Sequence, residues 1–583
     1  MNNLLDIFLI FLTFNGIVFL INSIRNNFFS FFESASLLIL FLVSTYAVWR
    51  TLGFSIYTFS ILTIGFYFLK TRKTFFLIRP NLQDLLYPNL IWLLFALVYF
   101  VIPGWDFGYP HEDYIIYSRI AYYNDRFGVE NTQTFYNIIS NPGKIEVYHY
   151  AELWLSSLFK RINGLSFIPN LILISYPLMS YFLFLGINDL LKNQTKFHGF
   201  LVTCLILLVF NPYDEVLRFF DIGLPLVGFS SLIFNLKTLF ILPPIILAFK
   251  GIIDDNPNYF LISIFSLFYP LIIPVLFIGL GLYEFFIGKR NKRNILIIIG
   301  FLGLFGFFST FFRLSGTEIN FNYFFDINVV SKMIWIAFIV PGLLLSVPIY
   351  YLDKNFRERT IDFLFFTFFV FITGAFFYIL LFENIDSNQM FRNISSAVFS
   401  ILLGIGIFYS FKYNKKFAFL LLFLYCFPIT FNVFLPKSIK VSEEIVSLNK
   451  ALVPYNKLIF IPNREFVNSV YQYNERLNLQ ILEFFLIRED IDLINISAAF
   501  PISEKINNSV TINMVSTYKS ISPFVSYCHD WTFENADCLI DFAKSVKAEG
   551  ILIKGDYIDF FPIETTSLPG NFKLIIFNKY DSC

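Results

Sequence analysis

The first 434 residues form an almost unbroken series of apolar runs, which short polar segments separate from one another. A helix needs about 20 apolar residues to cross the roughly 30 Å hydrocarbon core of a bilayer, and most of these runs approach that length. The chain of 583 residues is 56% hydrophobic and only 15% charged, a composition that excludes a water-soluble globule. The pattern predicts an α-helical polytopic membrane protein with about 14 spans in residues 1–435. The net charge of +1 gives no field that would attract nucleic acid. The apolar runs make membrane lipid the expected surrounding.

Two of the apolar runs differ from a simple span. Leu4 to Ile21 has no basic flank before it and no small-residue cleavage site after it, so we expect a retained helix rather than a secretory signal. Tyr259 to Ile287 is too long for one span and contains Pro270 and Pro274. We expect this run to form two short spans, or a re-entrant pair, that turn near the prolines.

Lys and Arg gather in alternate loops, and loops of this kind stay on the cytoplasmic side. Lys250 and the basic cluster at residues 289–293 must then share a side, which requires the proline-containing run to cross twice. The crossings near Arg50 do not fit the alternation. The segments expected to face outward are residues 103–166, 211–231, 313–331, 383–393 and the tail from residue 436.

The tail, residues 436–583, carries charge at an ordinary density and is expected to form a small extracytoplasmic α/β domain. Phe533 to Lys547 is expected to be helical, with Gly550 at the place of a C-terminal cap. Cys528 and Cys538 can pair if the tail lies outside the cytoplasm. No Gly-rich phosphate loop follows any of its predicted strands, which disfavours an ATP-driven pump. The predicted strands are Leu458 to Ile461, Leu493 to Ile496, Ile551 to Ile553 and Phe572 to Phe577.

The outward loop 103–166 is too long to be a mere connector and is expected to contain a helix. Pro110 suits the first turn of this helix, and Gly128 is a natural terminator. The helix has an apolar stripe that should lie along the membrane domain. The stripe consists of Ile116, Ile120, Tyr123 and Phe127.

Glu112 and Asp113 lie in the first turn of this helix, at the edges of the apolar stripe. Partial desolvation there can raise the pKa of a carboxyl group towards the working range of a general base. The alternative is structural, because the helix macrodipole favours acidic residues in a first turn. Asp106, just after the preceding span, is either a further acid of the site or a solvated loop residue.

Further candidates are polar residues that could hold an anion. His149 and Glu152 are three residues apart and share a helix face, so His149 could bind a phosphate, or a divalent ion together with a carboxylate. The alternative is an interfacial aromatic belt with an incidental hydrogen-bonded histidine. Charges at membrane depth are costly and usually have a partner. The alternative for each cation is snorkelling or a local ion pair, such as that of Arg218 with Asp221. The candidate cations are Arg218, Lys237 and Arg392.

The run that starts with Glu112 and Asp113 continues with Tyr117, Ser118, Arg119, Ile120 and Ala121. It resembles the first large extracytoplasmic loop of the GT-C class of integral-membrane glycosyltransferases, which use polyprenyl- or dolichyl-phosphate-linked sugars. The segment YHYAELWL at residues 148–155 is similar to the second juxtamembrane helix of bacterial members. The outward domain after the last span is a further similarity. The tail has no W-W-D-like signature, which argues against an oligosaccharyltransferase.

The resemblance implies sugar transfer at the outer face of the cytoplasmic (inner) membrane, from a polyprenyl-phosphate-linked donor to a glycan, lipid or protein acceptor. It implies that Asp113 is the base, with Glu112 or Asp106 as a second acid. Arg392, Arg218 or Lys237, with His149, would bind the phosphate. No metal residue is assigned, and a divalent ion is the one cofactor alternative. The alternative functions are a lipid-linked-glycan flippase or other transporter, and a glycan polymerase or ligase of the O-antigen type.

Overall fold

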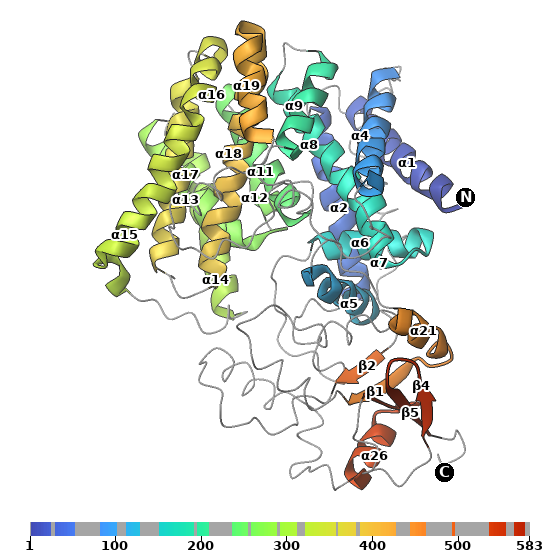
Figure 1. Cartoon of the computed structure of the whole chain (residues 1–583). Helices are drawn as coiled ribbons and strands as arrows, with labels where there is room; N and C mark the ends of the chain where they lie inside the picture. Colours follow the sequence, from blue (N-terminus) through green and yellow to red (C-terminus); the bar gives the residue numbers. More distant parts are fainter. Residues whose placement is uncertain are drawn as a thin grey trace. The chain divides into compact units, whose positions relative to one another are not determined.

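The protein is represented by a computed structural model that is mainly helical and has a small C-terminal sheet (Figure 1). The chain divides into two compact units, which we describe separately. The first unit contains residues 1–49, 54–103 and 147–436, and the second contains residues 50–53, 104–146 and 437–583. The structure describes residues 2–24, 30–52, 82–101, 112–128, 151–191, 195–208, 236–254, 258–266, 268–287, 292–311, 321–356, 359–380, 385–426, 443–461, 492–495, 536–554 and 565–577.

The first unit is a bundle of helices. Its elements are α1 (Asn2–Ile24), α2 (Phe31–Leu52, whose last turn clusters with the second unit), α4 (Leu82–Val101), α6 (Ala151–Asn163), α7 (Phe167–Asn170), η2 (Leu171–Ser175), α8 (Tyr176–Leu190), α9 (Lys196–Leu208), α11 (Leu236–Asp254), α12 (Tyr259–Ser266), η4 (Pro270–Ile272), α13 (Ile273–Phe286), α14 (Lys292–Phe311), η5 (Phe321–Phe324), α15 (Ile327–Ile334), η6 (Trp335–Ile339), α16 (Val340–Phe356), α17 (Thr360–Leu380), α18 (Ile385–Tyr413) and α19 (Lys415–Cys426).

Four helices in the described part of the chain are long and apolar enough to cross a membrane. This finding supports membrane association, but the expected count of about 14 spans is not confirmed. Several predicted runs, such as Gly53 to Leu69, lie outside the described residues. The four candidate spans are Phe32–Arg50, Phe167–Leu190, Thr360–Leu380 and Asn393–Tyr413.

The proline-containing run folds back on itself. It forms the eight-residue helix α12, a turn at Phe268 and Tyr269, and then η4 and α13. The hydroxyl of Tyr259, at the start of α12, donates a 2.5 Å hydrogen bond to Glu284 near the end of α13. Eight helical residues rise about 12 Å, so α12 is shorter than a full span. The run is a helical hairpin that turns near the prolines, as expected, and its two ends lie together.

A reciprocal pair of hydrogen bonds starts α2. The backbone N–H of Ser30 donates to Glu33, and the N–H of Glu33 donates to the Ser30 hydroxyl, which is a capping box. Glu33 also pairs with Lys250 near the end of α11, at 3.3 Å. At the other end of α2, Tyr46 bonds the carbonyl of Ser157 in α6.

The second unit contains α5 (Glu112–Phe127), α21 (Glu443–Ala451), α26 (Ala536–Ser545) and one five-stranded sheet. The sheet order is β2-β1-β3-β5-β4. Strands β1, β2 and β3 are parallel, whereas β5 is antiparallel to both β3 and β4. Each predicted strand of the tail is present. The strands are β1 (Lys457–Ile461), β2 (Asp492–Asn495), β3 (Gly550–Lys554), β4 (Thr566–Leu568) and β5 (Phe572–Ile576).

Gly550 does not cap a helix, contrary to the sequence-based expectation. It is the first residue of β3, where an added Cβ would lie 2.3 Å from the carbonyl oxygen of Ile575. The left-handed position after α26 belongs instead to Lys547, whose φ is 56°. The glycine is needed because two strands approach closely, and that contact depends on a residue 25 positions away rather than on local sequence.

Close helix packing in the first unit depends on Gly406 of α18. An added Cβ there would lie 2.4 Å from the Cβ of Pro348 in α16 and 3.0 Å from its carbonyl oxygen. In contrast, a Cβ at Gly300 of α14 would meet nothing within 4 Å. Small residues at helix interfaces let backbones approach, which is a main source of helix association in membranes.

We predict that Gly406→Val lowers the free energy of unfolding by about 1–3 kcal/mol or more, because the backbone of α16 cannot yield to the added methyl groups. The matched variant Gly300→Val should unfold almost like the wild type. Thermal unfolding of both purified proteins in the same detergent measures the difference. Equal midpoints for the two variants would show that α16 and α18 do not approach this closely.

Candidate functional site

Helix α5 is the predicted helix of the outward loop, and it begins at Glu112 and ends at Phe127. Gly128 follows with φ 68°, and its N–H donates to the carbonyl of Asn124 at 2.9 Å. This left-handed C-terminal cap is the role expected for Gly128 from the sequence. The C-terminal signal was therefore read correctly, whereas Pro110 lies outside the described residues.

The buried face of α5 includes the backbone position of Asp113. Ile120 is 4% exposed and Asn124 is 0% exposed. Residue 113 lies about 20° around the helix axis from both, because helical residues advance by about 100°. Residue 112 lies about 100° away from residue 113, on the side of the exposed Arg126. The backbone of residue 113, rather than that of residue 112, therefore lies on the face of α5 that Ile120 and Asn124 share.

The buried face is broader than the predicted apolar stripe. Ile120 is buried as expected, while the side chains of Ile116, Tyr123 and Phe127 lie outside the described ones. Sequence periodicity missed the small and polar members, because burial of such residues depends on what packs over them rather than on their own hydrophobicity. These members are Ser118, Ala121, Asn124 and Gly128.

Arg50 neutralises the C-terminal end of α5. Its guanidinium lies 3.3 Å from the carboxylate of Asp125 and donates to the backbone carbonyls of Asp125 and Arg126. A cation at this end of a helix is favoured by the macrodipole as well as by the carboxylate. Arg50 is thus an ion-pair residue within the second unit.

Helix α6 carries a buried acid that sequence reasoning treated only as a neighbour of His149. All residues from Ala151 to Phe159 are buried, and Glu152 is 1% exposed. The guanidinium carbon of Arg161 lies over the ring of Trp49, 5.2 Å from the ring centroid, and Trp154 packs edge-on to Tyr46. No local signal in the sequence singled out Glu152, because its burial depends on what packs over α6.

The hairpin tip brings two predicted cations into one region of the first unit. The side-chain amide of Asn393 donates a 2.7 Å hydrogen bond to the buried hydroxyl oxygen of Tyr269 at the tip. The ring of Phe268, the preceding residue, packs edge-on to Phe240 of α11, with centroids 6.0 Å apart. Arg392 precedes Asn393, and Lys237 lies one helical turn before Phe240. The backbone positions of Arg392 and Lys237 therefore flank the hairpin tip.

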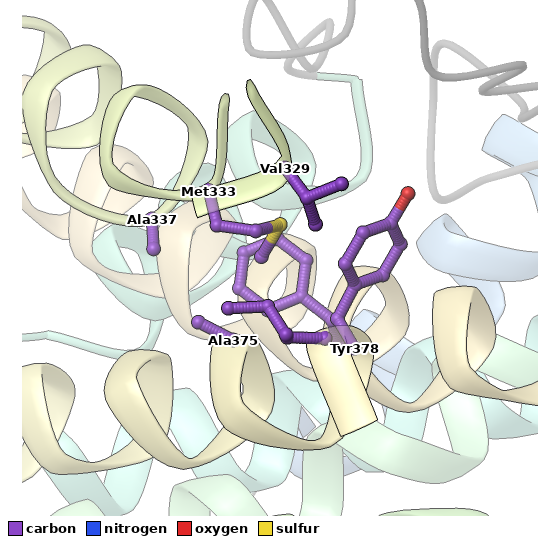
Figure 2. Close-up of a cluster of buried hydrophobic side chains, with 7 residues drawn as sticks. Val329, Met333, Ala337, Ala375 and Tyr378 are labelled. Atoms are coloured by element: carbon purple, nitrogen blue, oxygen red, sulfur yellow. The ribbon is translucent and has the colours of Figure 1, made fainter. Parts of the chain in front are cut away.

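An apolar cluster joins the C-terminal end of α17 to the part of α18 that precedes Asn393. Figure 2 shows Val329, Met333 and Ala337 facing Ala375 and Tyr378, with the Tyr378 hydroxyl pointing away from the methionine sulfur. Phe391 of α18, directly before Arg392, completes the cluster together with Ile379. Because Phe391 is only 2% exposed, this part of α18 has a defined rotation about its axis.

The remaining predicted site residues are Asp106, His149 and Arg218, and they lie outside the described residues. Glu112, Asp113, Lys237 and Arg392 lie in described helices, which give the positions of their backbone atoms. No group of three His, Cys, Asp or Glu that could hold a metal ion occurs within the described ranges.

We predict that Tyr269→Phe lowers the free energy of unfolding by about 1 kcal/mol, because the partly buried amide of Asn393 loses its acceptor. Tyr350→Phe, at a residue that is 57% exposed, is the matched control and should change little. Thermal unfolding in detergent measures both. A Tyr269→Phe protein as stable as the control would show that the hairpin tip is not held by this bond.

The chain matches no family model, no curated protein and no solved structure.

Proposed function

We propose that the protein is an integral-membrane glycosyltransferase at the outer face of the cytoplasmic membrane. It would move a sugar from a polyprenyl-phosphate-linked donor to a hydroxyl group of a glycan, lipid or protein acceptor. The observation that carries the proposal is the position of Asp113, which begins the amphipathic helix α5 on the face where Ile120 and Asn124 are buried. A carboxylate sheltered from water can work as a general base near neutral pH.

The reaction would be a single displacement with inversion. The acceptor oxygen forms a bond to the anomeric carbon while the bond from that carbon to the phosphate oxygen breaks, and the electron pair leaves on the phosphate. Asp113 accepts the proton of the attacking hydroxyl. The donor carries its own activated bond, so the reaction needs no ATP.

The leaving phosphate requires positive charge. Arg392 and Lys237 flank the hairpin tip and are the first choices for charge-assisted hydrogen bonds to it, with Arg218 and His149 as further candidates. The N-terminal end of α13 lies at the same tip and adds the favourable end of a helix dipole. Cations, a helix terminus and non-helical backbone at membrane depth together suit an anionic headgroup.

A disulfide supports the outward position of the second unit. Cys538 of α26 is disulfide-bonded, as expected if the tail lies outside the cytoplasm. Its expected partner Cys528 lies outside the described residues.

The helical hairpin specifically favours one rival function. Transporters commonly bind substrates at broken helices near the membrane midplane, so a flippase for lipid-linked glycans is the second candidate. The flippase would bind the same phosphate without needing a base. A glycan polymerase or ligase would share both the phosphate site and the base, and would differ in its acceptor.

We predict that Asp113→Asn lowers the turnover number about 10²- to 10⁴-fold with little change in donor binding, because the amide cannot accept the proton. Glu112→Gln is the matched control and should stay within about threefold of wild type, since a residue outside the buried face makes no contact with the reacting groups. Transfer of labelled sugar from a synthetic polyprenyl phosphate by protein in proteoliposomes measures both. Near-wild-type turnover of Asp113→Asn would remove this residue from the role of base.

We predict that Arg392→Ala and Lys237→Ala each weaken binding of polyprenyl phosphate about tenfold, the loss expected for one charge-assisted hydrogen bond. Lys332→Ala, at an exposed cation of α15, should bind normally. Titration with a fluorescent short-chain polyprenyl phosphate measures binding without turnover. Normal binding by both site variants would contradict the phosphate site, whereas weakened binding by both variants together with no sugar transfer by the wild type would favour the flippase.

A further inference from the structure

The carboxylate of Glu284, near the C-terminal end of α13, has one oxygen without a partner. The residue is only 4% exposed. Its Oε1 accepts a hydrogen bond from the Tyr259 hydroxyl at 2.5 Å and one from the side-chain amide of Asn294 at 3.4 Å. Its Oε2 is buried as well, and none of the described residues donates to it. A buried oxygen that has lost its water without gaining a donor is costly, and the cost is larger for a charged group.

Three helices enclose this carboxylate. Tyr259, which is 2% exposed, begins α12, and Asn294 lies in the first turn of α14. The adjacent Tyr283, which is 7% exposed, packs edge-on to Phe366 of α17. The surroundings are thus aromatic and shielded from water, so the missing partner of Oε2 must come from a bound species.

The local electrostatics favour a positive charge. Glu284 lies in the last turn of α13, where the backbone N–H of Ile287 donates to the carbonyl of Tyr283. The carbonyl groups of a last turn lack partners within the helix and form the negative end of its dipole. The carboxylate and the dipole therefore have the same sign at this place, and a cation relieves the repulsion between them.

The described cations on the neighbouring helices are already paired elsewhere. Lys250 of α11 lies 3.3 Å from the carboxylate of Glu33. Arg359, directly before α17, lies 3.2 Å from Asp362. Residues 292–293 are basic and open α14, but their side chains lie outside the described ones. A positive charge from solution is consequently the partner that this carboxylate requires.

We propose that Glu284, together with the Tyr259 hydroxyl oxygen, binds a single positive charge, taken up either as a small monovalent metal ion such as Na⁺ or as a proton. One carboxylate balances one positive charge, and the described part of the chain offers no cluster of three acidic, histidine or cysteine residues for an ion of higher charge. Occupation of the site would fasten the starts of α12 and α14 to the end of α13. The site does not depend on the proposed sugar transfer.

Thermal unfolding of the full chain in detergent tests the metal-ion form. We compare NaCl with choline chloride at equal ionic strength. Na⁺ should raise the unfolding midpoint of the wild type by at least about 2 °C, because an ion that binds only the folded state stabilises it. Glu284→Gln should abolish this difference. Glu443→Gln, at an exposed acid of α21, is the control and should respond like the wild type.

The same measurement over a range of pH tests the proton form. The midpoint of the wild type relative to that of Glu284→Gln should fall as the pH rises, because the folded carboxylate loses its proton and the amide has none to lose. Either dependence supports the site and identifies the species that it binds. Equal responses of the wild type and Glu284→Gln to both Na⁺ and pH would overturn the proposal.

A measurement on the unmodified chain decides the question if Glu284→Gln fails to fold. Dicyclohexylcarbodiimide adds to protonated carboxyl groups in apolar surroundings, and peptide mass spectrometry locates the adduct. A proton site predicts modification of Glu284 that increases as the pH falls, and a metal-ion site predicts protection by Na⁺ but not by choline. Modification that depends on neither Na⁺ nor pH, or that does not occur at all, would overturn the site.

Discussion

The hydrogen bond from Tyr259 to Glu284 joins the two ends of the helical hairpin formed by α12, η4 and α13. A buried turn must satisfy its polar groups within the protein, because an unpaired buried polar group is costly. The turn does so through Tyr269, whose oxygen accepts from Asn393 of α18, and through 3₁₀ backbone bonds such as that from Ile272 to Tyr269. Closed at one end and bonded to α18 at the other, the hairpin brings the start of α11 and the start of the α18 span to one place.

Two ion pairs in the described part of the chain lie at helix ends. Lys250 neutralises Glu33, which also caps α2, and Arg50 neutralises Asp125 at the end of α5. These pairs are partly exposed, so each contributes modestly to stability, and their main effect is to define which helix ends are neighbours. The cations at the hairpin tip belong to a different class in our proposal, since their partner would be the phosphate of the donor.

Local sequence signals predicted local structure well. Gly128 ends α5 as expected, and all four predicted strands of the tail appear, because turn chemistry and short β-branched runs act over a few residues. Gly550 failed as a cap because its role is to admit the carbonyl of Ile575, a contact that no local pattern reveals. The turn of the proline-containing run was expected from its prolines, whereas its bond to α18 was not, because Asn393 and Tyr269 are 124 residues apart.

The sequence by itself determined the membrane setting, the ends of several helices and the residue types available for chemistry, since hydropathy and capping depend on neighbouring residues alone. Only the tertiary structure decided that residue 113, and not residue 112, shares the face of α5 on which Ile120 and Asn124 are buried. It also decided that Lys237 and Arg392, 155 positions apart in the sequence, approach the same hairpin tip. Contacts between distant segments depend on how apolar surfaces pack, and packing is a property of all the helices together.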